Sequence, residues 1–307
     1  MNYKILKMDF YTSVHFGNGS LNKSEYSLHA DTIFSALCIE ACKQGIEYLD
    51  HFVTMCRSGQ VLLSDAFPYI GKTLYIPKPM LPVEFSEEDS SLKKQLKSLE
   101  YIPSDKLFEY LSGTMNIGRE NEKISQLGRA GLMEKAAIPE EGDTEPYAVG
   151  TYSFQRGNGL YLCIAYENEE DCDLVIDLME SLSYSGIGGK ISSGMGKFNL
   201  LMGAVPSELQ DRLEKTDCTE YMLLSVGLPR DDELEGVIQE AQYLLIRRSG
   251  FVASNTYSDS FTKKKNLYLL KPGSVVKEKF SGDIYDVSDH GRHPVYRYAK
   301  PIYLGVR

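Results

Sequence analysis

The chain has 307 residues and a formal net charge of −10 at pH 7. Its hydrophobic fraction of 42% and its charged fraction of 25% are typical of folded globular proteins and exclude a fibrous or disordered chain. No apolar run approaches the roughly 20 residues that a membrane-spanning helix needs, and the first residues include lysines where a secretion signal would be apolar. We therefore expect a cytoplasmic protein without membrane attachment.

Charge is distributed unevenly along the chain. Residues 167–180 contain seven acids and no base, residues 247–271 contain six bases and one acid, and residues 290–307 contain four Lys or Arg and no acid. This separation favours a localised basic surface for nucleic acid, with acidic surfaces elsewhere for protein partners. For each of these charged segments considered alone, the alternative is a solvent-exposed surface without a function.

The first half reads as strands and helices in alternation. Aromatic and branched residues at alternate positions predict a strand over 3–14 that ends in the turn Gly17-Asn18-Gly19. Asp31 as an N-cap, apolar residues at helical spacing and Gly45 after them predict the first helix. A shorter helix over 47–56 and strands near 61–63 and 74–76 follow.

Residues 88–150 lose clean periodicity, and we interpret them as an excursion from the core. After them, 151–154 and 160–166 are predicted to pair as a hairpin around Gly157-Asn158-Gly159. An acidic amphipathic helix over 171–182 leads into a glycine-rich loop and a strand near 198–202.

The fold class is therefore predicted as α+β. The order of elements in the first half fits a ferredoxin-like sandwich with one exposed sheet face. We place the first domain at 1–215, with the excursion inserted at about 88–150, and the second, mostly of strands, at 216–307.

The glycine-rich segment Gly186 to Phe198 has five glycines and two lysines in thirteen residues. Glycine lets main chain approach a ligand closely, and successive amides can form a concave site for phosphate oxygens. The segment is neither a P-loop, because Met195 stands where that motif requires lysine, nor a dinucleotide fingerprint. A plain flexible turn is the alternative. Eight residues of the segment are candidate RNA contacts: Gly188, Gly189, Lys190, Ser192, Ser193, Gly194, Met195 and Lys197.

A glycine-rich loop after an acidic helix resembles the RAMP superfamily of CRISPR RNA-binding proteins. The runs HFGNGSLNKSEYSLHADTIFSALCIEA, GIGGKISSGMGKF and HPVYRYAKPIYLGV, in this order, resemble the fourth Csm subunit of type III-A CRISPR interference complexes. The resemblance implies two tandem ferredoxin-like (RRM-like) domains with a projecting thumb. It also implies a subunit, not an enzyme, that holds the 5′ handle of the crRNA and contacts the large polymerase/cyclase-like subunit and the backbone RAMP subunit.

On this resemblance, His15, Gly17 and Gly19 lie beside the glycine loop and line the path of the handle, although a surface histidine without function is the alternative for His15. Arg119 and Arg129 belong to the thumb excursion. The second half adds hydroxyl, amide, aromatic and cationic side chains of the kind that bind single-stranded RNA: Arg248, Ser254, Asn255, Tyr257, Lys263, Lys264 and Arg297.

Two other functions compete with this interpretation. A metal-independent endoribonuclease that processes precursor crRNA would use His15 as its general base, and it would need a second positioned group and a cation for the transition state, for which Lys190 and Tyr26 are the candidates. A structural adaptor would contact protein alone through the acidic helix. Six scattered cysteines without a C-x-x-C pair, and His290 and His293 in a loop without further ligands, give no good metal site. We predict no metal and no cofactor.

Overall fold

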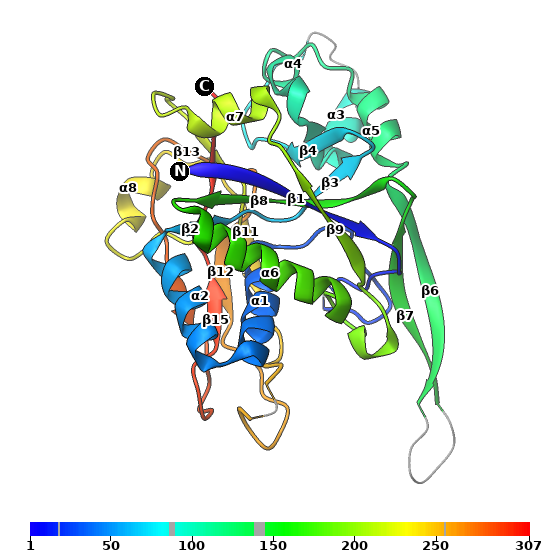
Figure 1. Ribbon diagram of the computed structural model, residues 1–307. Helices are drawn as coiled ribbons and strands as arrows, with labels where there is room; N and C mark the ends of the chain where they lie inside the picture. Colours follow the sequence, from blue (N-terminus) through cyan, green and yellow to red (C-terminus); the bar gives the residue numbers. More distant parts are fainter. Residues whose placement is uncertain (18, 86–89, 138–144, 255) are drawn as a thin grey trace.

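The computed structural model describes residues 1–17, 19–85, 90–137, 145–254 and 256–307. Its largest sheet has seven antiparallel strands (Figure 1). In order across the sheet these are β5 (Tyr101–Pro103), β4 (Thr73–Pro77), β3 (Phe67–Ile70), β8 (Asn158–Tyr166), β1 (Asn2–Phe10) and β9 (Phe198–Gly203), and β2 (Val61–Leu63) pairs with the far end of β8. The observed class is mixed α and β with antiparallel sheets.

One face of this sheet is covered by helices α1 (Ala30–Gln44), α2 (Ile46–Ser58) and α6 (Glu169–Ser185). Alternate residues of β1, including Leu6 and Met8, point to this face and join a buried cluster with apolar residues of all three helices. The helical spacing of the apolar residues predicted these helices, and Gly45 does end α1. Asp31, however, is not the N-cap: His29 holds that position, and Asp31 is a buried residue of the first turn.

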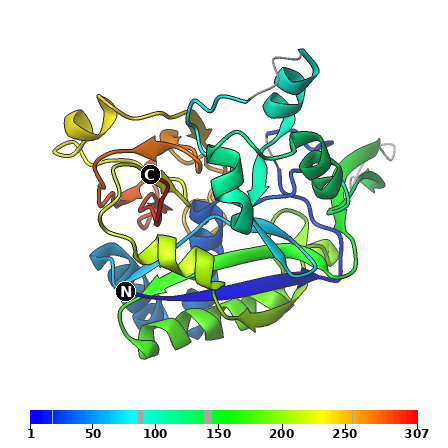
Figure 2. The ribbon, with the colours of Figure 1, turned by 90° about the horizontal axis from the view of Figure 1, so that it is seen from above.

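The opposite face is covered as well, which corrects the expectation of an exposed sheet face. Ile5, Tyr161 and Cys163 point to it and pack against Met222 and Leu304 of the second half. All nine residues of β8 are consequently buried. Seen from above, most of the second half and the segment after β4 lie on the side of the sheet away from α6 (Figure 2). The apolar side chains of that second half need the sheet face for their own burial.

The predicted excursion has two parts. The first is a compact helical segment that packs on the same apolar cluster through Leu107, Tyr110 and Ile117. It contains α3 (Ser90–Ser98), the single-turn η1 (Ser104–Lys106), α4 (Leu107–Leu111) and α5 (Ile117–Ile124), and α7 (Ser207–Glu214) lies next to η1.

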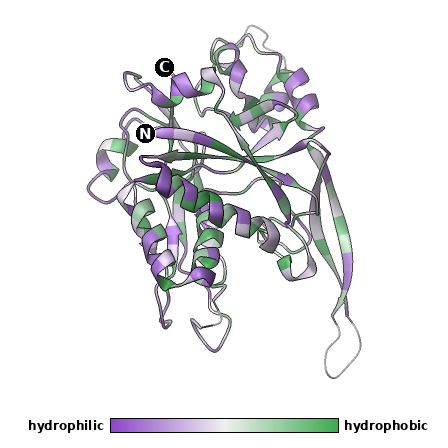
Figure 3. Cartoon of the chain, in the orientation of Figure 1, coloured by the Kyte–Doolittle hydropathy of each residue, from purple (hydrophilic) through white to green (hydrophobic). Residues whose placement is uncertain are grey.

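The second part is a hairpin that projects from the body (Figure 1). β6 (Gly128–Ala137) and β7 (Glu145–Phe154) pair along ten residues. The predicted hairpin between 151–154 and 160–166 is wrong: the turn at Gly157 exists, but both edges of β8 are occupied by β1 and by β2 with β3, so β7 turns away and pairs with β6. Hydrophobic positions lie along the hairpin (Figure 3), where the side chain of Leu132 is 66% exposed.

Short strands dominate the second half, as predicted from its composition. They form one three-stranded sheet and two strand pairs. The sheet contains β13 (Val275–Val276), β10 (Tyr221–Leu223) and β16 (Tyr303–Gly305), and the pairs are β11 (Leu245–Arg248) with β12 (Leu267–Leu270) and β14 (Ile284–Asp286) with β15 (Tyr296–Tyr298); α8 (Leu234–Ile238) is a short helix.

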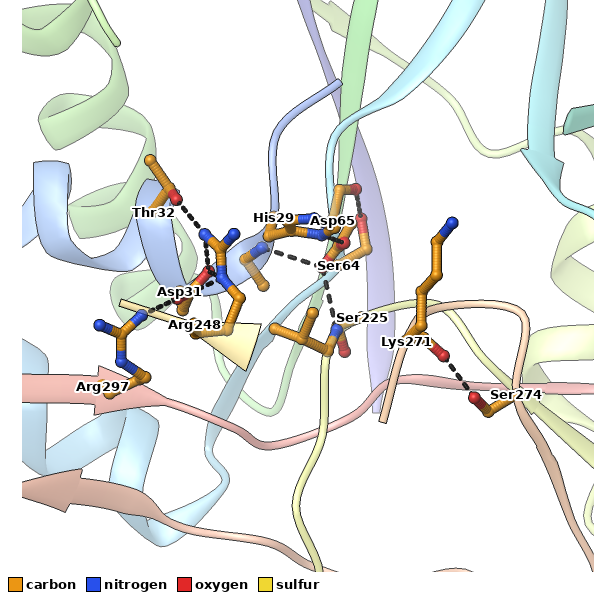
Figure 4. Close-up of polar contacts among 12 residues, drawn as sticks. His29, Asp31, Thr32, Ser64, Asp65, Ser225, Arg248, Lys271, Ser274 and Arg297 are labelled. Atoms are coloured by element: carbon orange, nitrogen blue, oxygen red, sulfur yellow. Dashed lines mark hydrogen bonds and ion pairs between the residues drawn. The ribbon is translucent and has the colours of Figure 1, made fainter. Parts of the chain in front are cut away.

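One buried carboxylate, Asp65, joins the two halves (Figure 4). Its Oδ1 accepts hydrogen bonds from the amides of Ala30 at 2.9 Å and Val226 at 3.0 Å, and its Oδ2 lies 2.5 Å from Nδ1 of His29. The amide of Asp65 itself donates to the carbonyl of Leu224 at 2.8 Å. The start of α1, the β2–β3 junction and the chain after β10 are therefore held at one point.

A second carboxylate, Asp31, fixes α1 to β11 and β15. Arg248 donates to both of its oxygens, at 2.8 and 3.0 Å, and the buried Arg297 donates to Oδ2 (Figure 4). Burial alone would raise the pKa of Asp31, but the charge and hydrogen bonds of Arg248 and the charge of Arg297 outweigh it and lower the pKa to about 2.

Replacing Asp65 tests the junction of the halves. Asp65→Ala leaves two buried amides without an acceptor, so we expect it to lower the free energy of unfolding by about 4 kcal/mol. Asp65→Asn keeps one oxygen for both amides and should cost about 1 kcal/mol. Urea unfolding measures both, with Asp211→Ala on the exposed side of α7 as the control. Equal losses for Ala and Asn would contradict the role given to the two amides.

Acid sensitivity tests the Asp31 cluster. A carboxylate with a lowered pKa stabilises the fold above its unfolded value near 4 and loses this contribution as the pH falls toward its folded value. We expect Asp31→Asn to lower the free energy of unfolding by about 3 kcal/mol at pH 7, because a buried guanidinium loses its counter-charge. The difference from the wild type should shrink between about pH 4 and pH 2; a difference that stays constant over this range would contradict the assignment.

Candidate functional site

The glycine loop, residues 186–197, connects α6 to β9 and folds against the segment that follows β1. The amide of Gly189 donates to the carbonyl of His15 at 2.8 Å, and that of Gly196 to Ser13 at 3.0 Å. The amide of Ile187 donates to Gly196 at 3.0 Å, so the loop also closes on itself. We call residues 13–17, which follow β1, the tip of the first strand. The loop and this tip are thus joined through their main chains.

Close packing explains most of the glycines. A Cβ at Gly189 would lie 2.6 Å from Cδ2 of His15, and one at Gly188 would lie 2.9 Å from the carbonyl oxygen of His15. At Gly196 the distance to the carbonyl oxygen of Ile187 would be 2.1 Å. These contacts are far too short for any side chain, so the glycines allow the loop and the strand tip to touch. At Gly194 a Cβ would meet nothing within 4 Å, but the left-handed φ of +82° favours glycine there.

The outer turn of the loop faces solvent. Ile191, Ser192 and Ser193 form a single 3-10 turn, η2, and are exposed. Among the described residues, no acceptor takes the amides of Ile191 and Ser192. Lys190 and Lys197 are half-buried at either end of the turn. Met195 is buried, which removes it from the predicted contact surface.

His15 lies beneath this loop and is buried. Its Nδ1 is 2.7 Å from the carbonyl oxygen of Gly150 in β7, so Nδ1 carries a proton and donates it. In the neutral ring Nε2 is then an acceptor, on the edge that faces Gly17. Gly17 and Gly19 are exposed, and Asn18 between them lies outside the described residues.

Strand β7 completes the surface. Nζ of Lys190 lies 5.2 Å from the ring centre of Tyr147, and Val14 and Tyr152 bond to each other through both amides. A shallow open groove lies between residues 22–25 and β6, and Thr151 of β7 forms part of its wall. Sequence reasoning missed Tyr147, because only the fold brings its ring to Lys190.

The predicted thumb residues are separated by the fold. Arg129 is exposed on β6, near the base of the hairpin. Arg119 is exposed on α5, in the helical segment, and its amide donates to the side chain of Asn116. Neither residue contacts the glycine loop through an interaction found among the described residues.

Three of the seven predicted contacts in the second half are occupied inside the protein. Arg248 and Arg297 both bind Asp31, and Tyr257 is 1% exposed, with its hydroxyl accepting from the amide of Asp289 at 2.5 Å. These three side chains are therefore not available as phosphate or stacking contacts. Their identity suggested RNA, but the partners that occupy them are distant in sequence.

The other four predicted contacts of the second half are Ser254, Asn255, Lys263 and Lys264. Ser254 is half-buried and bonds to Nε2 of His293 at 2.8 Å, and Asn255 lies outside the described residues. Lys263 is exposed, whereas Lys264 is half-buried; burial and the charge of Arg297 lower the pKa of Lys264. Lys263 therefore remains the freer cation of the two.

Within the described part of the chain, no group of three or more His, Cys, Asp or Glu residues has the arrangement of a metal site. None of the helices in those same residues has the length and hydrophobicity needed to cross a membrane.

The comparisons with known proteins agree with the sequence resemblance. Residues 216–306 match the family model described as the CRISPR Csm4 C-terminal domain. A protein of Mycobacterium tuberculosis named CRISPR system Cms protein Csm4 is 37% identical over 100% of this chain and 98% of its own length.

Two solved structures have the same fold. One, the crystal structure of a Csm3-Csm4 subcomplex of the type III-A CRISPR-Cas interference complex, gives a TM-score of 0.68 at 20% identity and covers 98% of this chain and 99% of the other. The other, a Csm1-Csm4 cassette with AMPPNP, gives 0.65 at 18% identity and covers 100% and 98%. The full-length identity to the curated protein confirms the predicted resemblance, and the chain belongs to the Csm4 family.

Proposed function

We propose that this protein is a non-catalytic RNA-binding subunit of a type III-A Csm complex and that it holds the 5′ handle of the crRNA. The observation that carries the proposal is the exposed turn of the glycine loop beside the tip of the first strand. Open amides at Ile191 and Ser192, the hydroxyls of Ser192 and Ser193, and the flanking Lys190 form one small donor-rich surface.

Phosphate oxygens are the ligands that such a surface suits. Successive amides and hydroxyls donate hydrogen bonds to an anion, and the two lysines add charge without requiring a particular base. The net charge of −10 argues that attraction to RNA is local and not spread over the molecule.

The wider architecture supports the same assignment. When α2 and the segment from β4 to β7 are set aside, β1, α1, β2 with β3, β8, α6 and β9 run in the order β-α-β-β-α-β, with α1 and α6 on one face. We propose that 1–215 is a ferredoxin-like domain, that 216–307 is its shorter tandem partner, and that the excursion at about 88–150 supplies the thumb. The β6–β7 hairpin, with exposed apolar residues, would be the part of the thumb that reaches the RNA.

Two protein partners are part of the proposal. The structural neighbours are described as complexes of Csm4 with Csm1 and with Csm3. We infer that this chain docks a large subunit of the Csm1 kind, which is the polymerase/cyclase-like subunit, and a backbone RAMP subunit of the Csm3 kind. A guide-RNA complex works inside the cell, so we place the protein in the cytoplasm.

The buried position of His15 supports a binding role over catalysis. One ring nitrogen already donates to Gly150, and main chain from Gly17 and Gly189 packs closely around the ring. A 2′-hydroxyl would need to reach Nε2 within about 3 Å for proton transfer. In its present packing His15 shapes the strand tip and supports the glycine loop.

Removing the two lysines tests the RNA surface. We expect Lys190→Ala with Lys197→Ala to weaken binding of a labelled handle RNA roughly tenfold or more at low salt, and to reduce the salt slope by about one to two. Fluorescence anisotropy over a salt titration measures both. The double variant should unfold at the same urea concentration as the wild type.

The matched control is Lys72→Ala with Lys215→Ala, which removes the same charge from two exposed positions away from the loop. This variant should bind like the wild type. If the control weakens binding as much as the test variant does, the attraction is general and the glycine loop is not the site.

The non-catalytic assignment predicts that precursor RNA survives incubation with the wild type in EDTA, with the same length on a denaturing gel. The RNA should also keep its length with His15→Gln, a variant that keeps an N–H donor for the Gly150 carbonyl. Shortened RNA with the wild type and intact RNA with His15→Gln would instead establish the endoribonuclease.

A further inference from the structure

Two phenylalanine rings stand exposed on the loop of residues 250–264, which we call the aromatic loop. The Phe261 side chain is 93% exposed and that of Phe251 is 56% exposed. Their ring centres are 6.5 Å apart with the planes at 87°, so the rings meet edge to face. Exposed neighbouring aromatic rings lose the free energy of burial and mark a contact surface.

The main chain holds these rings in place. The amide of Val252 donates to Thr262 at 3.0 Å, and the amide of Lys264 donates to Gly250 at 2.8 Å. Phe251 and Lys263 face each other across this short antiparallel ladder. A ladder of this kind fixes both ends of the loop and reduces the entropy that a ligand would have to remove.

The charge around the rings is positive. Nζ of Lys263 lies 5.7 Å from the ring centre of Phe251, and Lys265 beside it is exposed. The acid of the loop, Asp259, is paired with Arg292 at 2.7 Å. Aromatic faces next to cations are what single-stranded nucleic acids bind, because bases stack on the rings while phosphates meet the cations.

We propose that Phe251 and Phe261 form a stacking platform for an unpaired base of the guide RNA, with Lys263 meeting the adjoining phosphate. This inference rests on the proposed function and extends it to a second contact on the same strand. In Figure 1 the aromatic loop lies below α1, and the β6–β7 hairpin extends in the same direction. The sequence analysis predicted a stacking role for Tyr257, whose ring belongs to the same loop but is buried. Phe251 and Phe261 take that role in this proposal.

The experiment uses the full chain and handle RNAs with 2-aminopurine at one position at a time. Stacking on a ring quenches this fluorophore, so the wild type should quench it at one or two neighbouring positions. Phe251→Leu with Phe261→Leu should abolish the quenching and weaken binding roughly ten- to hundredfold, because leucine keeps the apolar bulk but has no π face. Phe251→Tyr with Phe261→Tyr should preserve both.

Phe108→Leu is the matched control, since Phe108 is 73% exposed on α4. It should bind and quench like the wild type. Quenching and affinity that survive in the double leucine variant overturn the platform. A leucine variant that keeps RNA binding but no longer co-purifies with the other Csm subunits also overturns it, and makes the rings a protein contact.

The lysine variant of the glycine loop separates this inference from the function on which it rests. If Lys190→Ala with Lys197→Ala loses the RNA while the double leucine variant retains it, the platform fails and the RNA-binding role stands. If the wild-type chain does not retain handle RNA, both fail.

Discussion

Main-chain contact between the glycine loop and the tip of the first strand is the constraint on which the candidate site depends. Gly188 and Gly189 lie so close to His15 that a methyl group would not fit at either position. The same closeness lets Gly189 donate to the carbonyl of His15, while the amides of Ile191 and Ser192 in the exposed turn find no acceptor among the described residues. A backbone held this firmly presents its donors in a fixed arrangement, which reduces the entropy lost when an anion binds.

Burial on both sides of the central sheet determines which other surfaces are free. The helices take one face and the second half takes much of the other, so RNA cannot lie across the sheet as it does on an exposed one. Asp65 and Asp31 maintain this arrangement by tying the start of α1 to the second half. The surfaces left for a ligand are loops and the projecting hairpin, where exposed apolar and cationic side chains remain.

Local patterns predicted much of the fold. The helical spacing of Ile33, Phe34 and Leu37 and the glycine after them identified α1, and alternation identified β1. The failures have long-range causes. Asp31 has the chemistry of an N-cap, yet its partners Arg248 and Arg297 lie 217 and 266 residues away.

The candidate site divides in the same way. The glycine loop was recognised because its composition is local, and the family resemblance correctly placed it beside His15. Tyr257 and the two arginines were selected for their chemistry, but their burial depends on partners that no short window contains. Phe251 and Phe261 were missed because phenylalanine in a sequence suggests a core residue, and only the structure places these two in solvent.

The central claim is that the strand tip and the glycine loop hold the leading nucleotides of the guide. Photo-crosslinking of RNA with thiouridine near its 5′ end, in the assembled complex, followed by mass spectrometry of the peptides, tests it most directly. The account predicts adducts within residues 13–19 and 186–197. Adducts confined to other parts of this chain, or to the other subunits alone, would contradict it.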